Sequence, residues 1–336
     1  MKILVLGGTR FVGKHMVEAA TARGHEVTLF NRNQRPGVFP DLETLVGDRD
    51  GDLKALEGRT WDAVIDTCGY VPRIVKKSLE ALASRVGHYT FISTLDVYDQ
   101  PDVVGIDESH PLAPLSDESV EDVQDAYGPL KARCEQEVER AMPGRSLIVR
   151  CGLVVGPGDL SDRFTYWPTR IARGGETLAP GNPNAPIQWI DARDLAGWVV
   201  RMIERQAHGV YNATGPQPWA TVGDVLSRSN AALGSPADFV WVEEPFLLER
   251  GVGFWIELPL WLPEKENLGG IMTLNVSKAV REGLTFRPLE DTVRDTFAWD
   301  RARGADVKRV AGLDAEKERR LLDEWRRFLD ARMQGA

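Results

Sequence analysis

The first half of the chain alternates short apolar runs with segments of helical periodicity. Apolar runs that end at glycine or polar positions predict buried strands. These runs are Lys2–Leu6, Glu26–Phe30, Thr44–Val46, Asp62–Asp66, His88–Ser93 and Ser146–Arg150. Apolar positions at helical spacing predict helices between them, notably over residues 12–23, 72–85 and 127–141. Strands alternating with helices form parallel βαβ units, so the sequence predicts an α/β fold with a Rossmann-type doubly wound parallel sheet.

The pattern changes after Gly156, where Pro, Gly and Trp become frequent and the expected elements become short. No linker composition separates the two halves, so we expect a lobe packed against the sheet and no tethered module. We assign residues 1–155, with returning segments near 186–215, to the sheet domain. Residues 156–185 and 216–312 form a smaller, mixed α/β lobe in this interpretation. Residues 313–336 have apolar positions at helical spacing and predict a C-terminal helix.

Composition excludes several classes of protein. The 336 residues carry a formal net charge of −9, from 41 basic and 50 acidic side chains, which disfavours general binding to nucleic acid or to anionic membranes. Three widely spaced cysteines fit a reducing compartment, and no apolar run reaches the roughly 18 residues of a membrane span. We therefore expect a cytoplasmic protein. The five histidines lack metal-ligand spacing, so we expect no metal.

A glycine-rich segment, GGTRFVG at residues 7–13, lies directly between the first strand and the first helix. Glycine permits a tight turn and a close backbone approach, and a helix N-terminus presents free N–H groups to an anion. The segment could also be an ordinary strand-to-helix turn, but its context favours a site for the phosphates of a dinucleotide. The expected binding residues are Gly7, Thr9, Arg10, Phe11, Val12 and Gly13.

Two further positions bear on the choice of dinucleotide. NAD-selective sites carry an acidic residue at the end of the second strand, where this chain has Asn31 and Arg32. Arg10 and Arg32 could pair with a 2′-phosphate, which favours NADP over NAD, although Arg32 could also be a solvated loop residue. Asp48 could accept a hydrogen bond from the adenine amino group or simply stabilise its turn. We expect Asn31, Arg32, Asp48 and Arg49 to contact the cofactor.

Tyr127 and Lys131 are four residues apart and therefore share one face of a helix. Pro129 is acceptable only in a first turn, so Tyr127 lies near the start of that helix. A neighbouring ammonium favours the phenolate, so Tyr127 could act as a general acid or base. The same spacing also arises by chance on exposed helices. Thr94 ends the fifth strand, where its hydroxyl could bond the reacting oxygen or only strand-end backbone.

These features together resemble the extended short-chain dehydrogenase/reductases, in an atypical form of the NAD-dependent epimerase/dehydratase family. The resemblance covers roughly residues 1–300. It implies that Thr94, Tyr127 and Lys131 are the catalytic residues and that Lys131 also bonds the nicotinamide ribose. The matching segments are GGTRFVG (7–13), GDRD (47–50), FISTLDVY (91–98), YGPLK (127–131), RCGLVVGP (150–157), QWIDARDLA (188–196) and GVYNATGP (209–216).

Two residues of this chain differ from the family pattern, and they bear on which reaction and which substrate class we expect. Arg10 replaces the middle glycine, which resembles a branch that includes plastid proteins described as RNA-binding. Leu153 stands where sugar-nucleotide enzymes tend to have asparagine, and the RxGxxxGP form resembles reductases of apolar hydroxy or keto compounds. The resemblance therefore implies an NAD(P)-dependent oxidoreductase. The alternatives are a sugar-nucleotide epimerase or dehydratase and a non-catalytic NADP-binding sensor or RNA-associated protein.

The second half holds most of the ten tryptophans, which could line a pocket for an apolar substrate or pack the smaller lobe. Trp167 is one candidate for contact with a substrate. Arg163 and Arg193 are candidate anchors for an anionic substrate group, or else form salt bridges. The resemblance allows a homodimer through the tyrosine-bearing helix, although the residues of that helix give no argument for it.

Overall fold

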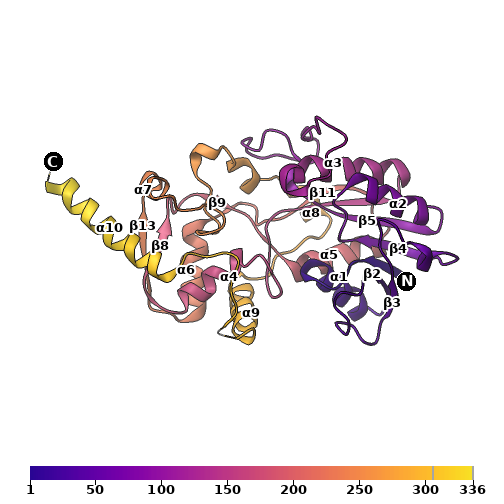
Figure 1. Ribbon diagram of the computed structural model, residues 1–336, viewed down its shortest axis with the longest axis horizontal. Coiled ribbons are helices and arrows are strands. Elements are labelled where there is room, and N and C mark those ends of the chain that lie inside the picture. The colour runs from indigo at the N-terminus through magenta and orange to yellow at the C-terminus, as the bar shows by residue number, and fades with distance from the viewer. Residues whose placement is uncertain (305, 335–336) are drawn as a thin grey trace. The chain divides into compact units, whose positions relative to one another are not determined.

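The computed structural model describes residues 1–304 and 306–334, which fall into two compact units (Figure 1). The first, called here the sheet unit, comprises Met1–Val154, Trp189–Gln217 and Thr273–Phe286. The second unit comprises Val155–Gln188, Pro218–Met272 and the described residues from Arg287 onward. The chain thus returns to the sheet unit twice. The sequence interpretation had the chain return near residues 186–215 and assigned Thr273–Phe286 to the smaller lobe, whereas the contacts of Thr273–Phe286 place this segment in the sheet unit.

The sheet unit contains seven parallel strands in the order β11-β6-β5-β4-β1-β2-β3. The predicted doubly wound fold is confirmed, and β11 is a strand that the sequence analysis did not list. The order reverses between β1 and β4, which is where ligands bind in such sheets. The strands are β1 (Lys2–Leu6), β2 (Glu26–Asn31), β3 (Glu43–Val46), β4 (Trp61–Asp66), β5 (Val86–Thr94), β6 (Ser146–Cys151) and β11 (Gly209–Ala213).

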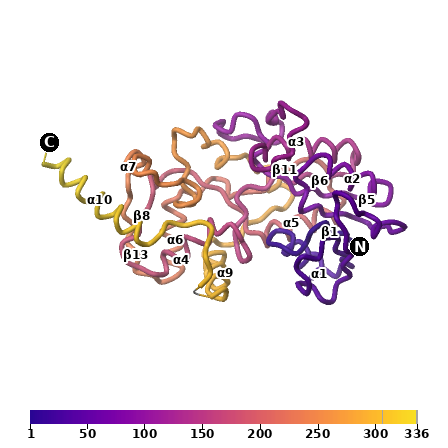
Figure 2. The backbone as a smooth tube through the Cα atoms, in the orientation of Figure 1, coloured from indigo at the N-terminus to yellow at the C-terminus, as the bar shows by residue number. Residues whose placement is uncertain are grey.

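Helices cover both faces of this sheet (Figure 1). On one face are α1 (Phe11–Ala22), α5 (Ala192–Glu204) and α8 (Ser277–Arg281); on the other are α2 (Pro72–Leu82) and α3 (Val123–Ala141). Strand β1 shows the alternation, since Ile3 and Val5 pack with Met16 of α1 while Leu4 and Leu6 face the α2 side. Burying each such side chain contributes about 1.5–3 kcal/mol. Figure 2 traces the backbone through β1, β5 and β6 of this layer.

The second unit is built from short strand pairs and helices. Strand β8 (Gly175–Pro180) pairs in parallel with β13 (Ala237–Val242), and β9 (Pro186–Ile187) pairs antiparallel with β12 (Ala220–Thr221). Its helices are α4 (Arg163–Ile171), α6 (Val222–Leu233), α7 (Glu244–Glu249), α9 (Leu289–Ala302) and α10 (Ala315–Gln334). Its single 3₁₀ turns are η3 (Glu264–Glu266) and η4 (Gly269–Met272).

The sheet unit also contains the 3₁₀ turns η1 (Lys54–Leu56) and η2 (Leu95–Val97) and the two-residue strand β10 (Ile190–Asp191), which pairs with β7 (Val154–Val155).

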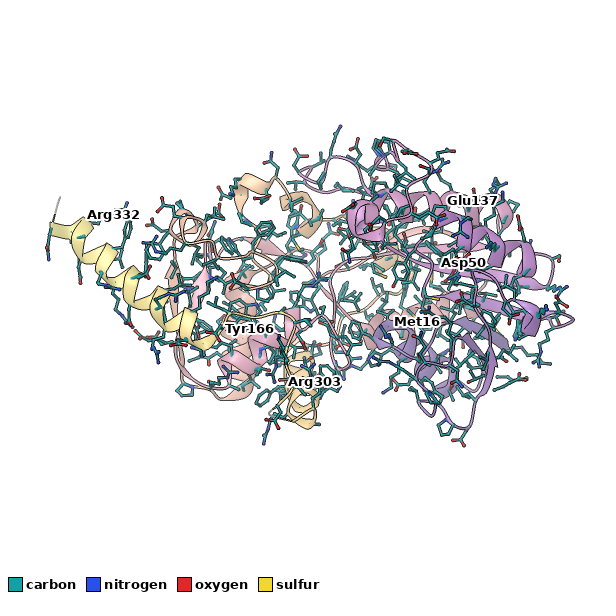
Figure 3. All side chains as sticks on the ribbon, in the orientation of Figure 1. Met16, Asp50, Glu137, Tyr166, Arg303 and Arg332 are labelled. Atoms are coloured by element: carbon teal, nitrogen blue, oxygen red, sulfur yellow. The ribbon has the colours of Figure 1, made fainter. Side chains whose placement is uncertain are left out.

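Helix α10 corresponds to the C-terminal helix expected from the sequence, and residues 335–336 of that expectation lie outside the described residues. Trp325 on α10 is buried, and its ring lies 4.9 Å from Phe246 of α7 and 5.4 Å from Phe328. Arg332 near the end of α10 pairs with Glu243 (Figure 3). Among the described helices, none has the length and apolar character needed to cross a membrane.

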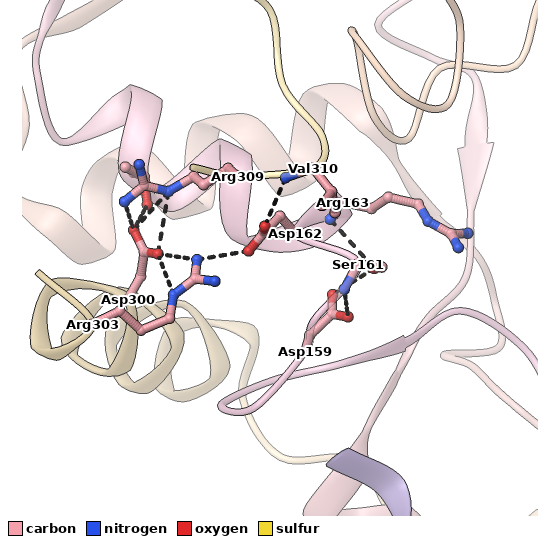
Figure 4. Close-up of polar contacts among 9 residues, drawn as sticks. Asp159, Ser161, Asp162, Arg163, Asp300, Arg303, Arg309 and Val310 are labelled. Atoms are coloured by element: carbon pink, nitrogen blue, oxygen red, sulfur yellow. Dashed lines mark hydrogen bonds and ion pairs between the residues drawn. The ribbon is translucent and has the colours of Figure 1, made fainter. Parts of the chain in front are cut away.

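A buried polar cluster fixes the ends of α4 and α9 in the second unit (Figures 3 and 4). Asp300 is 1% exposed and accepts hydrogen bonds from Thr169 at 2.7 Å and from Arg309 at 2.5 Å. Arg303 bridges Asp300 to Asp162, which it contacts at 2.6 Å. Because two guanidinium groups converge on one buried carboxylate, loss of that charge removes the carboxylate that pairs with Arg309 and leaves Arg303 with Asp162 alone.

We therefore expect Asp300→Asn to lower the free energy of unfolding by about 3 kcal/mol, since breaking a buried ion pair leaves uncompensated charge. Urea denaturation followed by tryptophan fluorescence measures this change. Asp291→Asn is the matched control, because the Asp291–Arg294 pair is half exposed and such pairs contribute less than about 1 kcal/mol. Equal effects of the two substitutions would contradict the role given to the cluster.

Candidate functional site

The glycine loop is held tightly against the end of β1. Gly7 and Gly8 have φ of +96° and +83°, a region that favours glycine. A Cβ on Gly8 would lie 2.9 Å from the Leu29 side chain, and one on Gly7 would lie 2.7 Å from Thr67 Oγ1. The side-chain amide of Asn31 donates to the Gly7 carbonyl at 3.1 Å, which ties the loop to the end of β2. The loop therefore has room for backbone alone.

The N-terminus of α1 follows this loop and is uncapped by side chains. Arg10 occupies the N-cap position without a side-chain cap hydrogen bond, and the first turn contains no acidic residue. The N–H groups of Phe11, Val12 and Gly13 belong to the first turn, where a helix supplies no partner of its own. Arg10 is exposed, and Thr9 is partly buried beside it. This arrangement fits the diphosphate of a dinucleotide, because backbone donors and a positive helix end converge on one point.

The residues expected near the adenosine half lie at the ends of β2 and β3. Arg32 is exposed at the end of β2, next to Asn31. Asp48 is exposed after β3, and its carboxylate accepts a hydrogen bond from the Asp50 N–H at 3.0 Å. Asp48 thus stabilises its own turn while remaining open to solvent, so the structure is compatible with both roles that the sequence left open.

The Arg49 side chain is paired with a buried carboxylate of the protein. Its guanidinium donates to both carboxylate oxygens of Asp66, at 2.7 and 2.8 Å, and Asp66 is fully buried. Tyr89 donates to the same carboxylate at 2.9 Å. Burial opposes ionisation of Asp66, but Arg49 holds the pKa of that carboxyl below its usual value. The Arg49 side chain therefore joins the β3–β4 connection to β4, so the prediction that it contacts the cofactor directly is not supported by its side-chain contacts.

The start of α3 positions Tyr127 by close packing. The backbone at Ala126 is non-helical, so the regular helix begins at Tyr127 and places Pro129 in its first turn, as the sequence predicted. A Cβ on Gly128 would lie 2.0 Å from the carbonyl oxygen of Asp96 in η2. The Tyr-Gly-Pro sequence therefore lets the first turn of α3 contact the backbone that follows β5, beside Thr94.

Lys131 is a buried cation, 3% exposed. Its Nζ donates to the carbonyls of Gly69 at 2.7 Å and Ile92 at 2.6 Å, and it lies 4.1 Å from the centre of the Phe91 ring. Burial lowers the pKa of this amine. An ammonium has three donors, and the two carbonyls occupy two of them. The remaining N–H fits a hydroxyl of a bound ribose.

Thr94, Tyr127 and Asp96 form a cluster of interacting side chains. The Thr94 hydroxyl donates to the Asp96 carboxylate at 2.7 Å and accepts from the Asp96 N–H at 3.2 Å. Burial raises the pKa of Tyr127, the Asp96 charge adds to the rise, and hydrogen bonding with Thr94 opposes it. Tyr127 is therefore a protonated phenol at neutral pH. The sequence analysis missed Asp96, whose only signal is its position two residues after Thr94.

The substrate candidates have different environments. Trp167 is fully buried, and its indole N–H donates to the Pro259 carbonyl at 2.8 Å, which supports the alternative that this tryptophan packs the second unit. Arg193 forms hydrogen bonds at 2.9 and 2.7 Å with the two carboxylate oxygens of Asp191, which supports the salt-bridge alternative. Arg163 is partly exposed, lies 5.5 Å from the Trp255 ring and extends away from the Asp300 cluster (Figure 4).

Comparison with known proteins gives a family match over more than half of the chain. The profile of the NAD dependent epimerase/dehydratase family matches residues 3–71 and 73–214. The epimerase family protein SDR39U1 of Bos taurus is 28% identical over 260 residues, covering 70% of this chain and 82% of that protein. The 2-alkyl-3-oxoalkanoate reductase of Stenotrophomonas maltophilia is 30% identical over 190 residues, covering 47% of this chain and 52% of that protein.

A solved structure shows the same fold. The crystal structure of human epimerase family protein SDR39U1 (isoform 2) with NADPH aligns with a TM-score of 0.60 and 21% sequence identity. The alignment covers 89% of this chain and 99% of that one. At this level of identity, the likeness supports the architecture and not the roles of individual residues.

The contact at Gly128 generates a test of the site. We expect Gly128→Ala to destabilise the protein and to weaken binding of NADPH, because the added methyl group would displace the start of α3 from the Asp96 carbonyl. Gly197→Ala in α5 is the control, since its Cβ would meet only the end of Arg201 at 3.5 Å. That change should stabilise by about 0.4–1 kcal/mol. Thermal unfolding and NADPH titration of both variants measure the difference, and a stabilised Gly128→Ala protein would contradict this geometry.

Proposed function

The chain belongs to the NAD dependent epimerase/dehydratase family, and on that premise we propose that it is an NADP-dependent oxidoreductase. It transfers a hydride between nicotinamide and a small molecule with a hydroxyl or keto group, with Tyr127 as general acid or base. The observation that carries the proposal is the gathering of Thr94, Tyr127 and Lys131 at the end of β5, with Lys131 bound to Gly69. Gly69 lies two residues after Thr67, and the side chain of Thr67 packs closely against Gly7 of the glycine loop.

The chain's own residues account for binding. The first-turn N–H groups of α1 hold the diphosphate, and the free donor of Lys131 holds a ribose hydroxyl. A bound nicotinamide dinucleotide supplies the hydride donor or acceptor. The apolar and glycine-rich surroundings of Lys131 exclude water from the ammonium, which strengthens its interaction with any charge that develops nearby.

In this proposal Tyr127 is the residue that transfers the proton. In the direction of reduction, its hydroxyl donates a proton to the substrate oxygen as negative charge develops there. Lys131, one helical turn away, stabilises the phenolate that remains. The Thr94 hydroxyl donates to Asp96, and its interaction with Tyr127 opposes the rise in the pKa of the Tyr127 phenol. In the direction of oxidation, the same phenolate takes the proton back.

The choice of NADP rests on Arg10 and Arg32, both exposed at the ends of the glycine loop and β2. Guanidinium groups form strong charge-assisted hydrogen bonds with phosphate. The presence of NADPH in the structure of the human relative is consistent with this choice.

The proposed substrates are apolar hydroxy or keto compounds. Leu153, which is buried, stands where the family's sugar-nucleotide enzymes tend to have asparagine. The reductase relative from Stenotrophomonas also supports a carbonyl substrate. Epimerisation or dehydration of a sugar nucleotide is the second candidate, favoured by the family itself. A nucleic-acid role is not proposed, since the chain has a net charge of −9.

Replacement of Arg32 tests the cofactor. We expect Arg32→Ala to weaken NADPH binding roughly 10- to 100-fold while leaving NADH binding unchanged, because only NADPH carries the 2′-phosphate. Fluorescence titration with each dinucleotide measures the two affinities. Arg35→Ala removes another exposed arginine of the same loop and serves as the control. Equal losses for both dinucleotides, or none, would refute the assigned contact.

Replacement of Tyr127 and Asp96 tests the proton transfer. We expect Tyr127→Phe to lower kcat about 10²–10⁴-fold without changing the NADPH affinity, since it removes the proton donor alone. The measurement is NADPH oxidation with a panel of ketones that includes acetophenone and 2-butanone. The Asp96 charge raises the pKa of Tyr127, so Asp96→Asn should move the alkaline loss of reductase activity to lower pH.

Asp102→Asn removes an exposed carboxylate of the following loop and should leave the pH profile unchanged. The proton-transfer assignment fails if Tyr127→Phe keeps wild-type turnover. It also fails if Asp96→Asn moves the alkaline limb to higher pH.

A further inference from the structure

Tyr70 is an aromatic residue that the proposed reaction does not use. It lies in the connection between β4 and α2, a segment with a rigid backbone. A Cβ on the preceding Gly69 would lie 2.5 Å from the Phe91 ring and 2.9 Å from Val75. Val71 then caps α2, with Pro72 in the first turn. The close packing on one side and the proline on the other fix where Tyr70 projects.

Two residues of the reaction site hold the Tyr70 ring. Its centre lies 6.4 Å from the Tyr127 ring at an interplanar angle of 37°, within the range of favourable aromatic pairs. The Lys131 ammonium lies 5.4 Å from the same centre, a cation–π distance. Phe91 contacts this ammonium from 4.1 Å. Tyr70 therefore touches both the proton donor and the buried cation.

Tyr70 also lies near the cofactor loop. Partial burial raises the pKa of its phenol, Cys68 and Asp66 add to the rise, and the Arg10 charge opposes it. The Arg10 charge therefore acts on Tyr70, and the geometry that fixes the ring is its contact with Tyr127 and Lys131. Because its phenol stays protonated at neutral pH, Tyr70 is suited to binding and not to proton abstraction.

The residue Tyr70 nevertheless remains 45% exposed, whereas Phe91 beside it is fully buried. A tyrosine has few rotatable bonds, so a ring already held by Tyr127 and Lys131 loses little further freedom when a ligand packs on it. An apolar surface of fixed orientation next to a proton donor favours a substrate with an apolar group beside its carbonyl or hydroxyl.

We propose that Tyr70 determines substrate specificity: its exposed ring receives the apolar ring or chain of the substrate while the reacting oxygen lies at Tyr127. This inference rests on the proposed function and adds the class of substrate, namely a ketone or alcohol with an aromatic or alicyclic group next to the reacting carbon.

The test compares a ketone with an aromatic group, acetophenone, with a small ketone, 2-butanone, in NADPH-dependent reduction. We expect Tyr70→Ala to lower kcat/KM for acetophenone roughly 5- to 30-fold through KM, and to change the value for 2-butanone less than about twofold. Tyr70→Phe keeps the ring and should retain the wild-type preference. Phe328→Ala removes a comparably exposed aromatic side chain of α10, 39% exposed, and is the matched control.

A binding measurement separates this inference from the proposed function. Calorimetry of acetophenone with the NADP⁺-saturated protein should show weaker binding to Tyr70→Ala than to wild type, with unchanged affinity for NADP⁺. If wild type reduces no ketone, the proposed function fails, and the calorimetric comparison still decides the role of Tyr70. Equal losses for both ketones, acetophenone binding unaffected by Tyr70→Ala, or a Tyr70→Phe variant as impaired as Tyr70→Ala would overturn the inference.

Discussion

The burial of the Lys131 charge is the constraint on which the site depends. An ammonium removed from water is costly unless it is paired or hydrogen-bonded, and Lys131 satisfies this requirement with backbone carbonyls of Gly69 and Ile92. The Gly69 carbonyl comes from the connection that follows β4, the Ile92 carbonyl comes from β5, and the lysine comes from α3. One side chain therefore joins three elements at the carboxyl edge of the sheet and leaves one donor for a ligand.

Other features of the site follow from that constraint. The first turn of α3 must approach β5 closely for Lys131 to reach both carbonyls, and Gly128 permits this approach because a Cβ would meet the Asp96 carbonyl. The same approach places Tyr127 beside Thr94 and Tyr70. Asp96 accepts a hydrogen bond from Thr94, and its charge adds to the effect of burial in raising the pKa of Tyr127. The phenol therefore stays protonated. The close packing at Gly128, the hydrogen bonds of Lys131 and the pKa of Tyr127 thus all depend on the close approach of α3 to β5.

The sequence predicted the fold and the family because local patterns carry them. Buried parallel strands read as apolar runs, and the family match confirms the resemblance drawn from the motifs. The sequence analysis did not list β11, because this strand contains the polar residue Asn212. The Asn212 side chain is buried and donates to the carbonyl of Ile106, which is far away in the sequence. The side-chain partners of Arg49 and Trp167, which are Asp66 and Pro259, could not be predicted because they are remote from these residues in sequence. Tyr70 has no motif at all, since only the folded chain brings its ring to Tyr127.

A crystal structure of the protein with bound NADPH tests the central claim most directly. The claim is that the glycine loop, Lys131 and Tyr127 serve one cofactor. The account predicts the diphosphate at the first turn of α1 and Lys131 Nζ within about 2.7–3.2 Å of a nicotinamide ribose hydroxyl. It also predicts a nicotinamide ring facing Tyr127. A dinucleotide bound with its ribose beyond hydrogen-bond reach of Lys131, or with its nicotinamide turned away from Tyr127, would contradict the account.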